Sequence, residues 1–285
     1  MAADSDTLDR NADRIVTEIG IAPCPAIVTQ LLRETRGDEP DFRRVGQLIG
    51  SDVALAASVL AVVNSPFYGL RSKATSVPQA LSMLGLDTVT QLVTGLLLRQ
   101  AFWGFTGEAM EGYWKRSMTT SLICALVSRE TRKGDRALAS TYGLFRDCGM
   151  PVMLRKFPIY ADLFEGTGIP PGEPVIEVEN ERYSTNHARI GLLLARNWQL
   201  PASMCLAILR HHDWLYSFDA RAQAQPAPLT LVATGLAADE LYCGATGSVC
   251  AEWEVAGGWA MSQLGLMPEK LDALRKLVRS SLESR

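Results

Sequence analysis

The chain has only three histidines, and all of them lie in one region of its second half. His187 stands near the start of one apolar segment, and the pair His211-His212 ends the next. Imidazole is a common metal ligand and a proton carrier near neutral pH. If the two segments form an antiparallel helical hairpin, the imidazoles meet at one end. A shared metal site is one interpretation; partly buried histidines bonded to carbonyls or to Asp213 are the other.

A second group with chemical potential is the Arg146-Asp147 pair in GLFRDCGMP (143–151). Asp147 offers carboxylate oxygens, whereas a guanidinium has no free lone pair and stays protonated. Of the two, only Asp147 can therefore act as a metal ligand. The sequence contains no glycine-rich phosphate loop and no nucleophile with a neighbouring base.

The six cysteines are scattered and include no CxxC pair. This spacing suggests neither a zinc ribbon nor a disulfide framework, so reduced and mostly buried thiols are expected. The cysteines are Cys24, Cys124, Cys148, Cys205, Cys243 and Cys250.

The segments that position these residues have the pattern of helices. Leu, Ala, Met, Arg and Glu dominate the periodic stretches, and alternating β-branched runs are few. Ser51 or Asp52 is a plausible N-cap for an Ala-rich helix that ends near Asn64 and is apolar on all sides, which predicts a central position. Ser76, with Pro78 in the first turn, begins a shorter helix. The sequence predicts an all-α protein.

The chain divides near the glycine-containing stretch at about 104–110. We expect an N-terminal helical bundle over residues 1–104 and a second bundle with closing helices over 105–285. In the second bundle, 117–130 and 135–149 form a helix pair. Ser184 or Thr185 caps the helix that carries His187, Pro201 starts the next helix, and two or three helices follow between about 228 and 282.

Composition limits the functional classes. A chain of 285 residues with 47% hydrophobic content can bury a sizeable core. Its longest apolar runs are shorter than the roughly 18 residues that a membrane span needs, so no membrane segment is expected. The formal net charge of −3 gives no basic footprint, which makes nucleic acid an unlikely partner. The polar, acidic N-terminus lacks a secretory signal, and a cytoplasmic location is expected.

Several motifs resemble the HDOD domain, a signalling relative of the HD phosphohydrolases. SDVALAASVLAVVNSPFYGL and SVPQALSMLGLDTVTQLV resemble its first half, including the Asn-Ser-x-Phe-Tyr-Gly element. GLFRDCGMPVML is similar to its Gly-Leu-Leu-His-Asp-Ile-Gly stretch, and NHARIGLLLARNWQLPASMCLAILRHHDW resembles its later histidine segment. The resemblance covers roughly residues 17–215 and implies an HD-like helical bundle in two subdomains.

The resemblance also implies a degenerate metal site. Active HD hydrolases hold metal with a first-helix His, a His-Asp doublet, further histidines in the larger members and a late Asp. The first two His positions match Arg116 and Arg146 here, and the late Asp matches Asp239. The vestigial positions are Arg116, Arg146, Asp147, His187, His211, His212 and Asp239. No catalytic residue, cofactor or metal is expected; weak metal candidates are Asp147, His187, His211, His212 and Asp239.

The two arginines have two interpretations. They replace the charge of the lost metal by pairing with Asp147 or Asp239, or they point to solvent. Paired arginines also suit the oxygens of a small phosphate-bearing ligand.

We therefore expect a non-catalytic HDOD module of a bacterial signalling pathway that acts through a regulatory protein partner or a small ligand. The alternative is a metal-dependent phosphohydrolase or phosphodiesterase with an altered ligand set, and Arg116 and Arg146 count against it. A DNA-binding regulator is disfavoured by the acidic charge balance.

Overall fold

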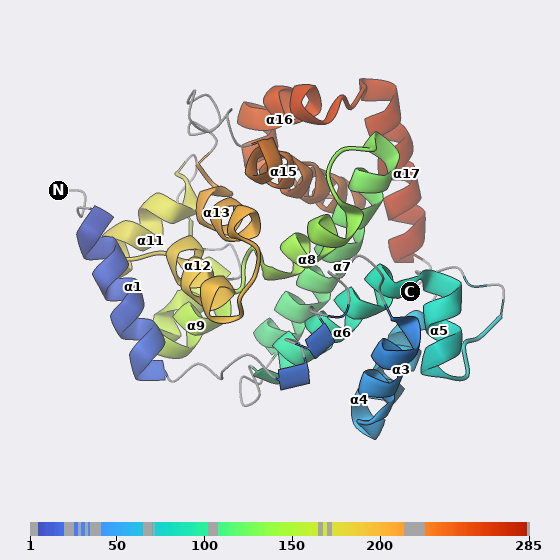
Figure 1. Cartoon of the computed structure of the whole chain (residues 1–285). Coiled ribbons are helices and arrows are strands. Elements are labelled where there is room, and N and C mark those ends of the chain that lie inside the picture. The colour runs from blue at the N-terminus through green and yellow to red at the C-terminus, as the bar shows by residue number, and fades with distance from the viewer. Residues whose placement is uncertain are drawn as a thin grey trace. The chain divides into compact units, whose positions relative to one another are not determined.

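The computed structural model describes most of the chain as α-helix (Figure 1). No strand occurs in the part that it describes, so the predicted all-α class is confirmed. The described residues are 5–19, 26–27, 30–31, 34, 41–64, 70, 72–101, 108–164, 168–169, 173–213 and 226–283.

The chain forms two compact units. The smaller one comprises residues 22–103 together with 279–285. Its helices pack against one another and are α3 (Phe42–Gly50), α4 (Val53–Val63), α5 (Val77–Leu84) and α6 (Leu86–Ala101).

Two helix starts in the smaller unit follow the sequence signals. The Asp52 carboxylate accepts a hydrogen bond from the Leu55 amide and caps α4, which ends at the C-cap Asn64. The Ser76 side chain accepts from the Gln79 amide and caps α5, with Pro78 in its first turn. Both caps satisfy amides that the helix itself leaves unpaired. The predicted starts are therefore confirmed.

The predicted central position of α4, with burial on most of its sides, is wrong. Only one face of the helix is buried, which carries Leu55, Val59 and Val63. Val53 on another face is 82% exposed. An Ala-rich helix offers little apolar area per residue, so burying one stripe of larger side chains suffices to hold it.

The larger unit comprises residues 1–21 and 104–278 and holds all the candidate site residues. Its helices are α1 (Ser5–Ile19), α7 (Glu108–Thr131), α8 (Arg136–Phe145), α9 (Gly149–Lys156), the 3-10 helix η2 (Pro158–Tyr160), α10 (Ala161–Phe164), α11 (Val175–Tyr183), α12 (His187–Asn197), α13 (Ala202–Arg210), α15 (Pro226–Thr246), α16 (Ala251–Leu264) and α17 (Pro268–Glu283), which ends in the smaller unit.

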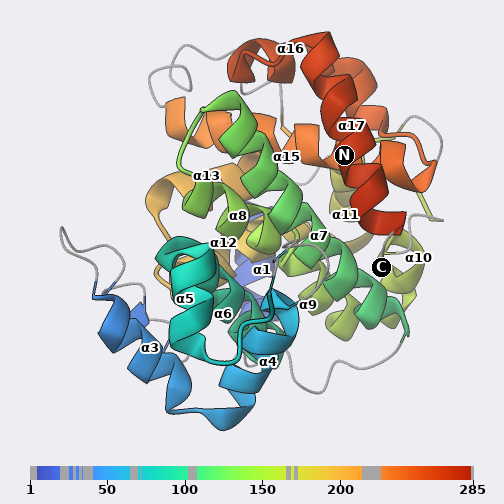
Figure 2. The same ribbon diagram turned by 90° about the vertical axis from the view of Figure 1, so that its right-hand side faces the viewer.

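The core helix of the larger unit is α15. It contacts α7, α8, α13 and α16, and Figure 2 shows α7 and α8 running beside it. Small and apolar residues occupy all its sides, and the run from Pro228 to Asp239 is buried except for Thr230. Small side chains let neighbouring helices approach from several directions. This arrangement carries Asp239 into the interior.

Helix α1 corrects the predicted domain boundary. The predicted N-terminal bundle of 1–104 included this segment, but α1 belongs to the larger unit, where it packs on α9 and α12. The apolar stripe Leu8, Ala12 and Ile15 is buried on one side of an otherwise polar helix. Such a stripe needs an apolar partner, and the hairpin that carries the histidines supplies one.

A close backbone approach places Asp147 beside the histidines. Gly149 starts α9, and an added Cβ at this position would lie 2.0 Å from the His187 carbonyl oxygen. Only glycine permits this contact. It brings the start of α9 against the start of α12 and sets Asp147, two residues earlier, next to His187.

No single helix among those described has the length and apolar composition to cross a membrane; α3 and α4 meet the criterion only as a pair, across a bend of 114°.

Candidate functional site

The residue that caps the His187 helix differs from the sequence prediction. Asn186, not Ser184 or Thr185, is the N-cap of α12, and its side chain accepts a hydrogen bond from the Arg189 amide. Ser184 has a left-handed backbone and ends α11, while the Thr185 hydroxyl donates to the Leu8 carbonyl. The two predicted caps are thus engaged elsewhere, and the helix starts directly at His187.

The hairpin of α12 and α13 brings the three imidazoles together. His187 Nε2 lies 3.2 Å from His211 Nε2 and 3.1 Å from His212 Nε2. Asp147 Oδ1 lies 3.1 Å from His211 Nε2 and 3.8 Å from His187 Nε2. Four ligand-type atoms from three segments therefore converge. We call Asp147, His187, His211 and His212 the histidine cluster.

The other ring nitrogen of each histidine has its own oxygen partner. His187 Nδ1 is 2.8 Å from both Glu179 oxygens, and His211 Nδ1 is 2.6 Å from the Ile208 carbonyl oxygen. His212 Nδ1 is 2.5 Å from Glu252 Oε1. Oxygen acceptors at Nδ1 favour the tautomer in which Nε2 presents a lone pair. All three Nε2 atoms then face one another as acceptors.

Glu179 is a fully buried anchor for His187. It accepts hydrogen bonds from the His187 amide and from the Tyr160 hydroxyl, in addition to the ring contact. Burial, the largest influence, lowers the pKa of His187, but the Glu179 carboxylate outweighs it, so this pKa lies above its ordinary value. Burial raises the pKa of Glu179, and His187 outweighs that effect, so the carboxyl stays ionised.

The other two histidines are neutral near pH 7. Burial and then the charge of His212 lower the pKa of His211 to about 4. Burial and then the charge of His187 lower the pKa of His212 to about 3. The Ile208 carbonyl can only accept, so the single ring proton of His211 sits on Nδ1. The bare Nε2 of His211 therefore faces the Asp147 carboxylate, which is also an acceptor.

This cluster fits one divalent transition-metal ion. If His187 Nε2 carries a proton, it can donate to only one neighbour, and the contact between His211 and Asp147 still has no donor. The four ligand atoms lie within 4.8 Å of one another. Four ligands at about 2.0–2.1 Å from a tetrahedral ion lie about 3.3 Å apart. Three of the contacts, at 3.1–3.2 Å, are close to this spacing, and the pair of Asp147 and His187, at 3.8 Å, is wider. Imidazole-rich sets with one carboxylate suit such ions.

Arg146 and Asp239 form a separate, buried ion pair outside the histidine cluster. Arg146 Nη2 lies 2.7 Å from Asp239 Oδ2, and their side chains are 5% and 9% exposed. Arg146 Nε is 3.3 Å from Asp147 Oδ2, a contact of charges rather than a directed hydrogen bond. Burial lowers the pKa of Arg146, but the two carboxylates outweigh it. Burial raises the pKa of Asp239, which Arg146 opposes.

Asp147 thus belongs to both groups. Its Oδ1 faces the histidines, and its Oδ2 faces the guanidinium. Burial raises its pKa most strongly, but the charge of Arg146 is the main opposing influence, and the pKa lies well below the usual value. The carboxylate stays ionised and links the Arg146 guanidinium to the histidine cluster.

Arg116 lies at the edge of the site. Its Nη2 is 3.8 Å from Asp239 Oδ1, its side chain is 54% exposed, and its guanidinium carbon lies 5.5 Å from the ring centre of Tyr242. The two arginines therefore differ, since Arg146 is buried between two carboxylates and Arg116 is half in solvent.

Replacing Arg116 with Ala is expected to lower the free energy of unfolding by less than about 1 kcal/mol, because exposed pairs are screened by water. Urea denaturation measures this difference. A loss several times larger would mean that Asp239 depends on Arg116 rather than on Arg146.

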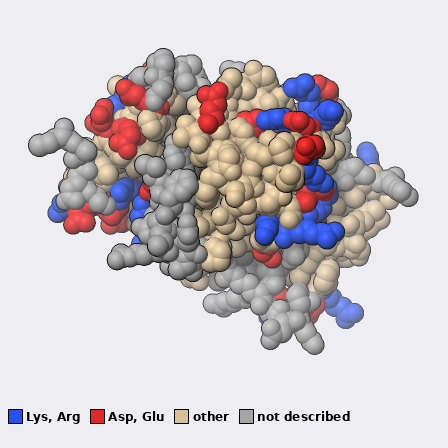
Figure 3. Space-filling view, turned by 90° about the horizontal axis from the view of Figure 1, so that it is seen from above, with Lys and Arg blue, Asp and Glu red and all other residues tan. Residues whose placement is uncertain are grey.

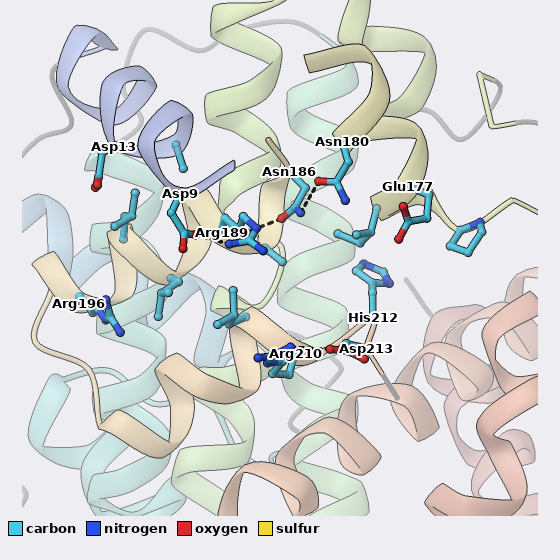
Figure 4. A pocket seen from close by; sticks show the side chains of 17 residues that line it. Asp9, Asp13, Glu177, Asn180, Asn186, Arg189, Arg196, Arg210, His212 and Asp213 are labelled. Carbon is cyan, nitrogen blue, oxygen red and sulfur yellow. Dashed lines mark hydrogen bonds and ion pairs between the residues drawn. The ribbon is translucent and has the colours of Figure 1, made fainter. Parts of the chain in front are cut away.

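A pocket of about 710 Å³ borders the cluster and is lined by α1, α11, α12 and the end of α13. His212 forms part of its wall, and Figure 4 shows Arg189, Arg196 and Arg210 along it. Arg189 pairs with Asp9, and Arg210 Nη1 lies 2.6 Å from Asp213 Oδ2. The pocket reaches the outer side of one imidazole of the cluster.

Sequence reasoning missed the residues that hold the imidazoles. Glu179 lies in VIEVENERY beside the exposed Glu177 and Glu181, and no local pattern separates it from them. Glu252 comes from a helix forty residues beyond His212. Only the fold brings these carboxylates to the rings. The sequence therefore offers no signal that singles out Glu179 or Glu252.

The fold and the site together define an all-α protein in which three histidines and a carboxylate converge within one unit. Residues 21–214 match the family model of the HDOD domain. The chain belongs to the HDOD domain family, which confirms the resemblance seen in its motifs.

Solved structures agree on the fold. An HDOD domain protein from Geobacter sulfurreducens has a TM-score of 0.74 at 22% identity, over 99% of this chain and 95% of the other. A provisionally assigned phosphohydrolase from Shewanella amazonensis SB2B has a TM-score of 0.71 at 18% identity, over 98% and 96%. At these identities the likeness establishes the fold alone.

Two curated relatives are longer proteins. An uncharacterised protein of Treponema pallidum is 25% identical over 213 residues, which cover 71% of this chain and 39% of that protein. The cyclic di-GMP phosphodiesterase CdgJ of Vibrio cholerae is 27% identical over 156 residues, which cover 52% of this chain and 35% of CdgJ. The chain thus matches well under half the length of either relative.

Proposed function

We propose that this chain is a non-catalytic regulatory module of a bacterial signal-transduction pathway, with an HD-type site that holds one divalent transition-metal ion. The observation that carries the proposal is the burial of the Arg146 guanidinium between Asp147 and Asp239. By resemblance to active HD proteins, a ligand histidine would stand at this position. The guanidinium supplies positive charge there but cannot bind a metal.

The arginine at that position weighs against hydrolysis. A metal-dependent hydrolase uses the ion to lower the pKa of a bound water and to neutralise charge on phosphoryl oxygens. Arg146 cannot generate hydroxide, and its charge is already shared by two carboxylates. The remaining ion would be held by His187, His211, His212 and Asp147, where it would cross-link α12, the end of α13 and the α8–α9 junction.

This ion revises the expectation, drawn from the sequence, that no metal or cofactor is bound. Asp239 is excluded from the ligand set because it pairs with the arginines. The earlier proposal of a phosphate-bearing ligand between Arg116 and Arg146 also changes, since Arg146 is buried. A small phosphate-bearing ligand would instead use the arginines around the pocket beside His212.

The output of the module is contact with a regulatory protein. Among the described residues of the face in Figure 3, Lys and Arg lie close to Asp and Glu and form no continuous basic stripe. Together with the net charge of −3, this distribution favours a protein partner over nucleic acid.

The second candidate is a metal-dependent phosphodiesterase that works with one ion. The histidine cluster favours it, because a bound ion with an open position can activate water. The CdgJ relative is named as a cyclic di-GMP phosphodiesterase. Most of that protein has no counterpart in this chain, so the activity does not carry over by similarity alone.

Metal analysis of protein purified without chelator, followed by an Mn²⁺-supplemented assay on a generic phosphodiester and a cyclic dinucleotide, tests the proposal. We expect about one ion per chain, as in single-ion sites with four protein ligands, and no turnover. His211→Ala should lose the ion, whereas the matched control Asp213→Asn, next to the cluster but paired with Arg210, should keep it. Turnover that disappears in His211→Ala would replace the proposal with the phosphodiesterase. Metal-free protein would overturn the ion.

A further inference from the structure

The pocket of about 710 Å³ beside His212 lies within the larger unit and is separate from the proposed ion site. Its walls come from α1, α11, α12 and the residues that end α13. Small-molecule sites in proteins have volumes of about 300–1,000 Å³. Of the four residues of the histidine cluster, only His212 lines the pocket. A small ligand could therefore occupy the pocket without entering the centre of the cluster.

One part of the pocket wall is apolar. Ala188 and Leu192 stand one turn apart on the same face of α12 and are buried, and Ala12 of α1 is buried as well. Leu193 and Leu209 are half-buried. A fully polar molecule would lose water along this wall without gaining hydrogen bonds in return. The wall therefore suits a ligand with an apolar body.

Two ion pairs neutralise some of the charges that line the pocket. Arg189 pairs with Asp9 of α1, and Arg210 Nη1 lies 2.6 Å from Asp213 Oδ2. Because each guanidinium already faces a carboxylate, it attracts an incoming anion less than an unpaired arginine does. The main charged contacts of a ligand must therefore come from other residues of the lining.

Three charged residues of the lining remain, namely Arg196, Asp13 and Glu177. None of them forms an ion pair with another residue that the structure describes. Figure 4 shows Arg196 and Asp13 on the same side of the pocket and Glu177 on the opposite side. An anion that approaches Arg196 is repelled by the Asp13 carboxylate, unless it also carries an amine. A guanidinium suits phosphate oxygens, and a carboxylate accepts from N–H groups.

We propose that this pocket binds a small phosphate ester that carries an amino group on an apolar body. Arg196 binds the phosphate, Asp13 accepts a hydrogen bond from the amine, and the leucines of the wall cover the body. The ligand specifies the phosphate-bearing molecule of the proposed function, and its meaning as an input signal rests on that function. The binding itself does not depend on the ion.

A ligand that contacts both charged residues ties α1 to α12, because Asp13 belongs to α1 and Arg196 to α12. Helix α1 is already bonded near the cluster, since the Thr185 hydroxyl donates to the Leu8 carbonyl at 3.2 Å, two residues before His187. Occupancy of the pocket should therefore slow hydrogen exchange of the amides in α1 and in the first turn of α12. Bound ligand with unchanged exchange in α1 would place it elsewhere and overturn the proposal.

Isothermal titration of the full chain with two pairs of phosphate esters tests the ligand class. Adenosine 5′-monophosphate is compared with purine riboside 5′-monophosphate, and tyramine phosphate with 4-ethylphenyl phosphate. Within each pair the second molecule has hydrogen in place of the amino group. In at least one pair we expect the amine to lower the dissociation constant by about tenfold, as a hydrogen bond to a charged group does.

The pair that responds to the amine shows whether the body is a nucleoside or a simple aromatic ring. Inorganic phosphate should bind more weakly than either member of that pair, because it has no apolar body. Equal affinities within both pairs, or inorganic phosphate that binds as tightly as the esters, would overturn the proposal.

Two variants separate the contacts of the phosphate from those of the amine. Arg196 and Asp13 are exposed, so their replacement does not threaten the fold. Arg196→Gln should weaken both members of the responding pair by about tenfold. Asp13→Ala should weaken only the ester with the amine and so make the pair equal. Arg136→Gln, which changes an exposed arginine at the start of α8 outside the pocket, is the matched control and should leave both constants unchanged. Unaltered binding by Arg196→Gln would refute the assigned site.

A repeat of the titration after treatment with a chelator separates this proposal from the ion site. The proposed contacts do not include the ion, so the amine preference should remain. Loss of binding in the chelated chain would overturn the pocket ligand, because the ion would then hold the phosphate. A purified chain without an ion that keeps the amine preference would refute the ion site and support the pocket ligand.

Discussion

Replacing Arg146 with Ala is expected to lower the free energy of unfolding by about 3–5 kcal/mol, the cost of removing one partner from a buried ion pair. The guanidinium is 5% exposed and lies against the carboxylates of Asp147 and Asp239. Without it, Asp239 is left with its weaker ion pair to Arg116, whose Nη2 lies 3.8 Å away and whose side chain is 54% exposed. Urea denaturation followed by circular dichroism measures the change.

Two further variants separate charge from packing at this position. Arg146→Met keeps a long buried side chain but removes the charge, and should be almost as unstable as Arg146→Ala. The Arg146→Ala, Asp239→Ala double variant removes both partners, so a coupling energy of about 0.5–3 kcal/mol is expected in the double-mutant cycle. If Arg146→Ala unfolds within about 0.5 kcal/mol of the unaltered chain, as an ordinary surface substitution does, the guanidinium does not hold this part of the fold.

Helix starts were predictable where one side chain does the capping. Asp52 and Ser76 stand before apolar runs, and each cap depends only on residues within one helical turn. The cap at Asn186 was misassigned because Ser184 and Thr185 are equally good candidates by type. Ser184 instead ends α11, and Thr185 bonds to Leu8 of α1, which lies far away in the sequence.

The burial of each element was less predictable than its type. The apolar residues of α4 suggested a central helix, yet Val53 is 82% exposed, and α15 occupies the core instead. The N-terminal helix was placed in the wrong unit, because its apolar stripe does not say which surface will cover it. Such partners are chosen by the whole fold.

The candidate site, like the fold, was predictable only in part. The types and order of the three histidines suggested that they meet, but not that their Nε2 atoms converge with Asp147. That convergence depends on Glu179, Glu252 and the Ile208 carbonyl, which aim the rings. The sequence could nominate ligands because residue type limits chemistry. It could not show which lone pairs face one another, because this is set by tertiary contacts.

Glu179→Ala is expected to have an effect as large as Arg146→Ala, and on two properties at once. The substitution leaves the His187 amide, its Nδ1 proton and the Tyr160 hydroxyl without their buried acceptor. Loss of one partner of a buried, hydrogen-bonded charge lowers the free energy of unfolding by about 3–5 kcal/mol. The freed His187 ring also loses its orientation, so ion affinity should fall by at least about tenfold. Urea denaturation and metal titration measure the two effects.

Two matched variants identify the cause of that loss. Tyr160→Phe removes one donor and leaves Glu179 its bonds to His187, so it should cost about 1 kcal/mol and preserve ion binding. Glu177→Ala removes an exposed carboxylate from the same helix and should stay within about 0.5 kcal/mol. If Glu179→Ala binds the ion as tightly as Glu177→Ala does, the cluster does not depend on an oriented His187, and the ligand set assigned here is wrong.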